Sequence, residues 1–235
     1  IFKTLLRDKL LLIKDEYVAM RLKSEYHLTI DDLPEKYQEL LKSDENVDMF
    51  LFYAEEFVKS IKPEGYGILG KYTNVVFEGA QGLLLDQNNK EYRPHLTSSN
   101  TGIKNVMHIL DGLRWKGNVD IYYMSRCYIT RHGAGPFEHE LGKKPYENVV
   151  DLTNIPNEFQ GALRFGYLDF DLLVKEINKD LKNLKVQANI HIVFTCLDQV
   201  DDVVKYYENG KLKEVAKSEF LQIAWKILSE KIEML

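Results

Sequence analysis

Residues 75–86 read VVFEGAQGLLLD and are followed at residues 97–101 by TSSNT. The apolar run stops abruptly at a small, glycine-flanked polar patch that holds one uncharged amide, Gln81. This pattern is typical of a buried strand that delivers a side chain into a site, because glycines let the backbone bend or approach a ligand closely. Continuous apolar strands favour a parallel sheet covered by helices, so the stretch predicts an α/β fold.

The periodicity of the remaining chain predicts the other elements. Apolar residues recur at helical spacing over 3–24, and further helices are predicted at 31–43, 48–61, 101–114, 168–181 and from 218 onward. Strands are predicted at 74–77, 119–124 and 190–195, and Asn209-Gly210 predicts a β-hairpin over 203–215. We therefore expect one partial α/β domain over 1–235, with a helical subdomain at 1–62 and a sheet-containing part at 63–235.

Composition excludes several classes of protein. The chain has 31 Lys and Arg against 36 Asp and Glu, interspersed, so a nucleic-acid partner is not expected. No apolar run approaches the roughly 20 residues that span a bilayer, and the first residues do not show the pattern of a signal peptide. Cys127 and Cys196 lack metal-type spacing. Neither a disulfide framework nor a metal site in this chain is expected, and a reducing cytoplasm fits best.

Four tracts resemble one known family. The FEGAQG-x-LLD and TSSN motifs are similar to those of adenylosuccinate synthetase, and residues 128–137, YITRHGAGPF, match its Y-x-T-R-x-G-x-G-P-F tract. Residues 157–159 and 166–169 flank what would be its aspartate-binding loop. Residues 195–198, TCLD, stand where the family has its guanine-reading T-K-L-D. The tracts occur in family order over residues 74–198.

The resemblance implies a fold and an activity. The fold would be a three-layer α/β arrangement with a mostly parallel sheet, related to P-loop nucleotide-binding folds, and residues 63–235 would be its nucleotide-binding part. The family joins aspartate to IMP with GTP hydrolysis and Mg²⁺, as a cytoplasmic homodimer. Because the chain starts at Ile1 and holds no Gly-rich loop followed by Lys-Ser/Thr, we expect a fragment that lacks the phosphate-loop region and the metal ligands. Such a fragment would be inactive alone.

By resemblance, three candidate residues would contact the purine nucleotide. Gln81 would be the catalytic residue and would hydrogen-bond near the 6-oxygen of the purine. Thr97 would contact the 5′-phosphate, and it precedes a predicted helix whose N-terminus favours anions. His132 would contact the ribose through its backbone. From the residues alone, Gln81 could instead satisfy a strand end, Thr97 could be an ordinary N-cap, and His132 could be a packing residue.

Two further candidates depart from the family pattern. Arg164 is the one arginine kept in the aspartate loop, where a guanidinium would hold a carboxylate in bidentate fashion. Asp198 would accept from guanine N1–H and N2–H, but the lysine that packs on the base is Cys196 here. From the residues alone, Arg164 could lie on the surface and Asp198 could end a strand.

These departures leave three functions open. The first is the family's ligase, the second is a divergent ligase for a modified purine nucleotide or another amino donor, and the third is a non-catalytic purine nucleotide-binding protein. Cys127, Glu138 and Glu140 receive no role from the sequence.

Overall fold

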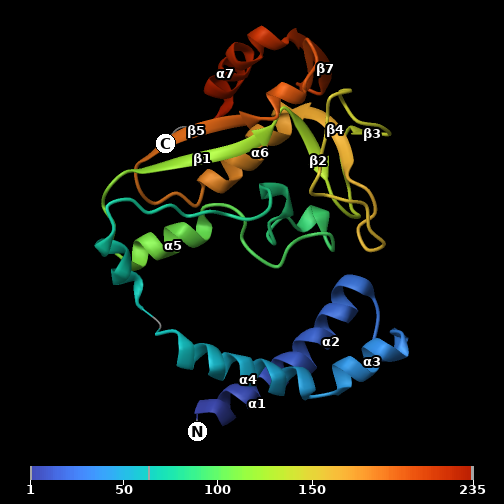
Figure 1. The fold of residues 1–235 in the computed structure, drawn as a ribbon, viewed down its shortest axis with the longest axis vertical. Coiled ribbons are helices and arrows are strands. Elements are labelled where there is room, and N and C mark those ends of the chain that lie inside the picture. The colour runs from blue at the N-terminus through green and yellow to red at the C-terminus, as the bar shows by residue number, and fades with distance from the viewer. Residues whose placement is uncertain (1, 63, 234–235) are drawn as a thin grey trace. The chain divides into compact units, whose positions relative to one another are not determined.

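The computed structural model describes residues 2–62 and 64–233 and divides into two compact units, Ile1–Val75 and Val76–Leu235. The first unit is helical (Figure 1). Its elements are α1 (Phe2–Leu12), a π-helical stretch (Ile13–Tyr17), α2 (Val18–Arg21), a second π-helical stretch (Leu22–Tyr26), a 3₁₀ turn (Ile30–Asp32), α3 (Glu35–Lys42), α4 (Glu45–Ser60) and a 3₁₀ segment (Tyr66–Lys71).

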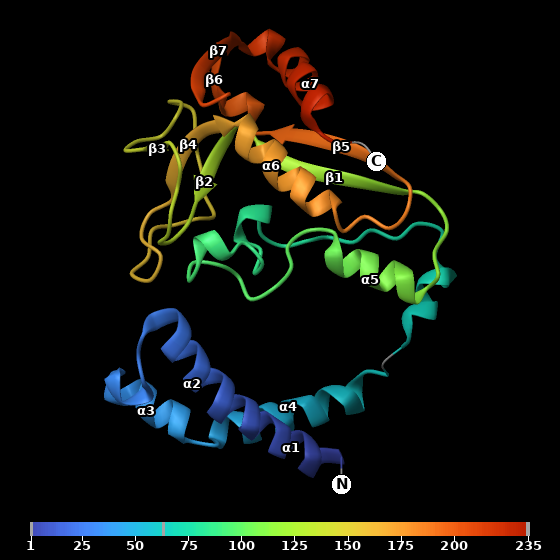
Figure 2. The same cartoon turned by 180° about the vertical axis from the view of Figure 1, so that it is seen from behind.

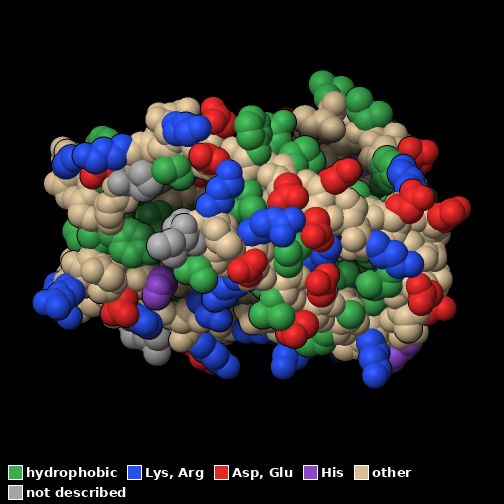
Figure 3. All heavy atoms as spheres, turned by 90° about the horizontal axis from the view of Figure 1, so that it is seen from below, with side chains coloured by type: hydrophobic (Ala, Val, Ile, Leu, Met, Phe, Trp, Pro, Cys, Tyr) green, Lys and Arg blue, Asp and Glu red, His purple; other side chains and the backbone are tan. Residues whose placement is uncertain are grey.

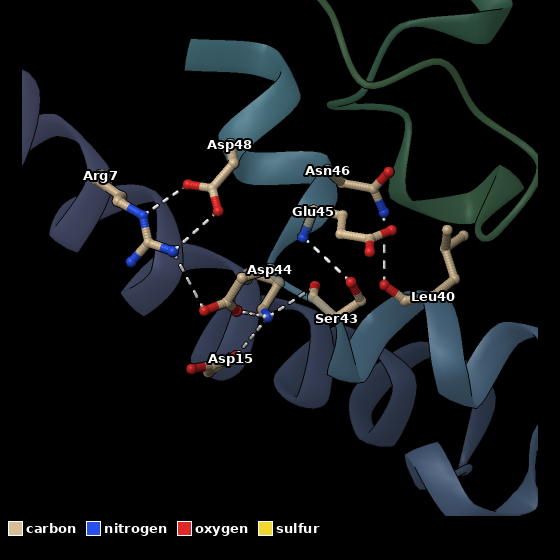
Figure 4. A network of polar contacts seen from close by, with 9 residues as sticks. Arg7, Asp15, Leu40, Ser43, Asp44, Glu45, Asn46 and Asp48 are labelled. Atoms are coloured by element: carbon tan, nitrogen blue, oxygen red, sulfur yellow. Dashed lines mark hydrogen bonds and ion pairs between the residues drawn. The ribbon is translucent and has the colours of Figure 1, made fainter. Parts of the chain in front are cut away.

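Ion pairs join the first helix of this unit to α4. Arg7 donates to both oxygens of Asp48, at 2.7 and 3.1 Å (Figure 4). Lys14 contacts Asp44 at 2.7 Å. Lys3 contacts Glu55 at 2.6 Å. As the basic residue moves along the chain from Lys3 to Arg7 to Lys14, its partner moves back from Glu55 to Asp48 to Asp44, so α1 and α4 run antiparallel. Most of these side chains are exposed, and such pairs contribute little stability each.

The second unit contains the sheets. Its elements are 3₁₀ turns at Leu83–Leu85 and Lys90–Tyr92, α5 (Lys104–Gly112), β1 (Val119–Arg126), β2 (Tyr128–Arg131), β3 (Glu140–Leu141), β4 (Arg164–Asp169), α6 (Phe170–Leu181), β5 (Ala188–Thr195), a 3₁₀ turn (Leu197–Gln199), β6 (Val203–Glu208), β7 (Lys211–Ala216), a 3₁₀ turn (Lys217–Glu219) and α7 (Phe220–Lys231). The predicted helices 101–114 and 168–181, strands 119–124 and 190–195, hairpin and last helix are confirmed, with shifted ends.

Two open sheets form in this unit. The first is the parallel pair β1–β5, which lie side by side in both views (Figures 1 and 2). The second has the order β2-β4-β6-β7, with β3 also paired to β4; only its β4–β6 pair is parallel. The α/β class is therefore observed, but the expectation of a mostly parallel sheet is wrong. Three of the five strand pairs are antiparallel because β2, β3 and the β6–β7 hairpin turn back on their neighbours.

Helices α5 and α6 cover one face of the β1–β5 sheet. Met107 and Leu110 of α5 pack with Ile121 and Tyr123 of β1 and with Ile177 of α6. On the opposite face of β1, Tyr122 is 60% exposed and Met124 is 69% exposed. A second core lies between the five-stranded sheet and α7, around Tyr128, Leu168, Phe170, Val204 and Phe220. Within residues 76–233 the parallel sheet carries one helical layer, so the expected three-layer order is not observed there.

The strand expected at 74–77 does not form. Residues 73–80 lie in no strand, and Val76 is 89% exposed. A strand requires a neighbouring backbone with which to pair, and no backbone hydrogen bond joins this segment to another part of the described chain. The composition of residues 74–77 is typical of a strand, but the prediction of a strand there is wrong.

Charges of both signs are mixed on the surface. On the face drawn in Figure 3, Lys and Arg side chains alternate with Asp and Glu, without a basic stripe among the coloured side chains. No helix among residues 2–62 and 64–233 has the length and apolar composition to cross a membrane.

Candidate functional site

The Gln81 segment lies against the end of the TSSNT tract. A Cβ built on Gly79 would stand 3.1 Å from the carbonyl oxygen of Thr101, so Gly79 permits this close approach. Gln81 itself has φ 61°, in the left-handed region, and its side chain is exposed. Among the described residues no hydrogen bond engages the Gln81 amide, which leaves it available to a ligand.

Backbone hydrogen bonds tie the TSSNT tract to the segment that follows Gln81. Thr97 N–H donates to Leu85 O at 2.9 Å, and Gln87 N–H donates to Ser99 O at 3.1 Å. Thr101 N–H donates to Asp86 Oδ2 at 2.8 Å. The structure therefore brings together the Gln81 and Thr97 segments, which the resemblance assigns to one nucleotide. The Thr101 hydroxyl is buried without a partner in the described chain, a feature that the sequence analysis did not single out.

The N-terminus of α5 is already occupied by a carboxylate. Asp180 of α6 accepts from the Ile103 N–H through both oxygens, each at 3.1 Å, and also accepts from the Tyr123 hydroxyl at 2.8 Å. A negative charge at this helix end satisfies the dipole that a phosphate would otherwise use. Asp180 therefore engages the N–H of the residue that precedes α5, and the phosphate role of the half-buried Thr97 stays a prediction.

Arg131 joins the glycine loop 133–135 to the loop before Thr97. Its guanidinium donates to Ala134 O at 2.8 and 3.0 Å and to His95 O at 3.0 Å. Gly135 has φ 111°, and a Cβ there would overlap the Arg131 guanidinium and stand 2.7 Å from His95 Cβ. Burial, and then the charge of Arg164, lower the pKa of Arg131. The loop is thus assembled around two neighbouring cations.

His132 lies inside this loop. Its Nε2 is buried and has no hydrogen-bond partner among the described residues. A buried imidazole nitrogen without a hydrogen-bond partner costs the folded state free energy. The side chain therefore offers a free donor or acceptor beside the backbone atoms that the sequence analysis assigned to a ribose.

Arg164 is engaged within the protein. It donates to both oxygens of Glu140, with Nε 2.7 Å from Oε1, and its Nη1 donates to Gly133 O at 3.1 Å and Gly135 O at 2.8 Å. The hydrogen bond and charge of Glu140 raise the pKa of Arg164. Glu140, which the sequence left without a role, is thus the partner of Arg164. In the sequence, the negative charge of Glu140 is the one feature that could have suggested a pair with Arg164.

Asp198 follows the carboxyl end of β5. Its side chain is exposed in the 3₁₀ turn Leu197–Gln199, which Cys196 opens with φ 60°. Gln199 Oε1 accepts from the Tyr128 hydroxyl of β2 at 2.7 Å, which links this turn to the strand that ends at Arg131. The carboxyl ends of parallel strands are common ligand sites. No described hydrogen bond or ion pair joins the Asp198 side chain to another candidate residue.

A sequence model of the adenylosuccinate synthetase family matches residues 6–222. The chain belongs to this family. The resemblance read from the four tracts is confirmed, and the family name denotes a ligase of purine biosynthesis.

Curated relatives agree with this assignment. The chain is similar to adenylosuccinate synthetase of Thermoplasma volcanium, with 29% identity over 182 residues, or 72% of this chain and 40% of the relative. Identity to the enzyme of Petrotoga mobilis is 30% over 156 residues, or 66% and 36%. Identity to that of Coxiella burnetii is 25% over 197 residues, or 81% and 40%. The chain thus spans 36% to 40% of the length of these relatives.

Proposed function

We propose that this chain is part of an adenylosuccinate synthetase-type ligase that joins aspartate to IMP with GTP hydrolysis. In this reaction GTP phosphorylates the 6-oxygen of IMP, and the aspartate amine then displaces the phosphate. The observation that carries the proposal is that the family motifs converge in space, because the Gln81 and Thr97 segments are hydrogen-bonded to each other and Arg131 joins the latter to the glycine loop.

Each candidate has chemistry that suits its proposed role. The free Gln81 amide would donate to the purine 6-oxygen, where negative charge develops in the transfer. The Thr97 hydroxyl would donate to the 5′-phosphate, and the backbone at His132 would contact the ribose. Arg131 and Arg164 supply positive charge around the same loop, which favours an anionic nucleotide.

The second nucleotide and its ion belong to the proposal as well. Asp198, an exposed carboxylate at a strand end, suits acceptance from guanine N1–H and N2–H, which adenine cannot reproduce. Mg²⁺ would neutralise the transferring phosphoryl group. The proposal assigns its ligands to a part of the ligase outside residues 1–235, and it includes a cytoplasmic homodimer.

A second candidate is a ligase of the same fold that uses another amino donor or a modified purine nucleotide. Arg164, the one arginine kept in the aspartate loop, is bound to Glu140 and to two loop carbonyls. With its donors used internally, Arg164 has little capacity for a substrate carboxylate. Cys196 in place of the lysine that packs on guanine favours this candidate too. A non-catalytic nucleotide-binding protein is the third.

The test uses the complete reading frame that contains this chain, expressed as one protein. Release of nucleoside diphosphate is measured with IMP and aspartate supplied together and singly. The ligase proposal expects release only when both are present. Release with IMP that ignores aspartate would support the second candidate, and IMP binding without any release would support the third.

A further inference from the structure

Three metal-binding side chains meet where two strands share one edge of β4. Strand β2 pairs along one edge of β4, whereas β3 and β6 pair along the other, β3 at Phe165–Gly166 and β6 at Leu168–Asp169. His139 and Glu138 immediately precede β3, and Asp169 ends β4. The topology therefore brings Glu138 and His139 to Asp169, although about thirty residues of sequence separate them.

The contacts fix two of these groups. The imidazole of His139 stacks on the ring of Tyr207, with centroids 3.7 Å apart and planes at 9°, and Tyr207 is the register partner of Asp169 across β4–β6. His139 Nε2 lies 3.5 Å from Asp169 Oδ2. The other oxygen, Oδ1, accepts from the Leu172 N–H and caps α6. One oxygen of Asp169 thus holds the helix while the other faces the imidazole.

Glu138 completes the cluster. One ligand atom from each of Glu138, His139 and Asp169 lies within 4.8 Å of the other two. Asp169 is only 6% exposed, whereas Glu138 and His139 are exposed. Within residues 2–62 and 64–233, no Lys or Arg nitrogen forms an ion pair with either carboxylate. Two carboxylates therefore lie near one imidazole without a basic side chain paired to either of them, and a bound cation would offset the burial of the Asp169 carboxylate.

We propose that Glu138, His139 and Asp169 bind a divalent transition-metal ion of the Zn²⁺ class. One imidazole and two carboxylates form a three-ligand set that Zn²⁺ accepts, with water in the open position, whereas Mg²⁺ prefers oxygen ligands alone. The bound cation neutralises the two carboxylates. Asp169 coordinates through Oδ2 and keeps the helix cap through Oδ1. This site is independent of the proposed ligase reaction, whose Mg²⁺ it does not supply.

The ion would fasten the segment 133–140 to α6. Arg164 already restrains this segment through hydrogen bonds to Glu140 and to the carbonyls of Gly133 and Gly135. The backbone is closely packed there, because a Cβ on Gly166 would stand 3.2 Å from His139 O. Metal binding at Glu138 and His139 would restrain the segment at a second point, so that the folded state gains stability as the free metal concentration rises above the dissociation constant.

The chain contains a matched comparison. His191 of β5 lies 3.0 Å from Asp120 Oδ1 and stacks on Tyr122 with centroids 4.4 Å apart. This group repeats the imidazole, the carboxylate and the aromatic ring of the proposed site. It lacks a third ligand, since no further His, Cys, Asp or Glu of the described residues groups with it. If His139 were only half of an imidazole–carboxylate pair, its substitution would affect Zn²⁺ binding as little as substitution of His191. If it is a metal ligand, its substitution should weaken Zn²⁺ binding.

The experiment titrates the purified, metal-free 235-residue chain with Zn²⁺ and follows heat of binding and the midpoint of thermal unfolding. Variants Glu138→Gln, His139→Gln and the control His191→Gln are treated identically. Glu138→Gln retains the His139–Asp169 contact and the Tyr207 stack, so it removes a ligand without removing the pair.

We expect one saturable Zn²⁺ site in the parent chain and in His191→Gln, with a rise in the unfolding midpoint. Glu138→Gln and His139→Gln should weaken binding by more than the roughly 10- to 100-fold that loss of an outer-sphere partner costs, and both should lose the rise. Absence of saturable binding in the parent chain overturns the proposal. Binding of unchanged affinity in Glu138→Gln and His139→Gln also overturns it, because the ion then lies elsewhere, for instance on a cysteine.

Discussion

Arg164 donates hydrogen bonds to both carboxylate oxygens of Glu140, with Nε 2.7 Å from Oε1, and uses its remaining amino group on the carbonyls of Gly133 and Gly135. One side chain therefore connects β4, the residue at the start of β3 and the glycine loop. A planar guanidinium suits this bidentate geometry, and lysine cannot reproduce it. The contact explains how the loop keeps its shape without a helix or strand of its own.

The first prediction concerns this pair. Glu140→Gln should weaken IMP binding several-fold, because the guanidinium loses a bidentate partner and the loop carbonyls lose a fixed donor. Affinity for IMP is measured by calorimetry on the complete protein. Glu147→Gln removes an exposed carboxylate with no described side-chain partner and should leave affinity unchanged. If Glu140→Gln instead tightens aspartate binding at equal IMP affinity, the role of Arg164 is to bind the substrate and not to hold the loop.

The second prediction concerns Gly135. Alanine at this position would adopt φ 111° and overlap the Arg131 guanidinium, so the hydrogen bond from Arg131 to His95 should break. We expect Gly135→Ala to lose IMP binding and to unfold about 2 kcal/mol more easily, in the range for a strained non-glycine residue. Gly142→Ala is the matched control, because nothing lies within 4 Å of a Cβ there. Equal urea midpoints and IMP affinities for the two variants would contradict the packing argument.

The third prediction concerns Asp180, which accepts from Ile103 N–H and the Tyr123 hydroxyl. Asp180→Ala leaves two buried donors unpaired, and we expect a loss of about 2 to 4 kcal/mol of unfolding free energy. Denaturation in urea measures it, with exposed Asp202→Ala as the control. Burial raises the pKa of Asp180 above its ordinary value. The folded state therefore binds this proton more tightly, and the contribution of Asp180 to stability grows as pH falls from the folded pKa toward the unfolded one.

Local chemistry explains which parts of the fold the sequence predicted. The β6–β7 hairpin follows from Asn209-Gly210, which take φ 51° and 67° as a tight hairpin turn requires. Helix α6 follows from its periodicity and strand β5 from its apolar run. In contrast, Val75–Phe77 has a strand's composition but no neighbouring backbone, and pairing is a tertiary property. Strand β4 was missed because Gly166, which lies against the Ile129 side chain and His139 O, interrupts its pattern.

The candidate site divides in the same way. The resemblance assigns Gln81 and Thr97 to one nucleotide, and hydrogen bonds at Leu85 and Asp86 join their two segments. The partners of Arg164 and of Ile103 N–H, Glu140 and Asp180, lie 24 and 77 residues away. No short motif marks such distant carboxylates, so their roles became visible only once the fold placed them.

The fourth prediction concerns Asp151 and pH. The N–H of Asn154, together with the hydroxyl and N–H of Thr153, holds the pKa of Asp151 below its ordinary value. A depressed carboxylate pKa stabilises the folded state above the unfolded pKa and loses that contribution as pH falls through the folded one. Asp151→Asn should therefore cost about 1 to 2 kcal/mol at pH 7. The cost should shrink as the medium is acidified below about pH 4.

Urea denaturation of Asp151→Asn and the parent chain at pH 7 and below about pH 4 checks this prediction, with Asp202→Asn as an exposed control. A difference that is constant with pH would mean that the Asp151 turn is stabilised by shape alone and not by the carboxylate charge.

The last prediction separates the role of Gln81 in the reaction from its role in the fold. Gln81 takes φ 61°, which costs a non-glycine residue about 1 kcal/mol, and its exposed side chain makes no hydrogen bond to a described residue. Gln81→Gly removes both the amide and the strain, so its unfolding free energy should stay within about 1 kcal/mol of the parent. Turnover of the complete protein should nevertheless fall roughly 100-fold or more, the cost of removing a donor from developing negative charge. Arg114→Gly is the control, because Arg114 also has a positive φ of 53° and an exposed side chain but stands at the end of α5. A matching loss of turnover in Arg114→Gly, or an undiminished rate in Gln81→Gly, would remove Gln81 from the chemistry.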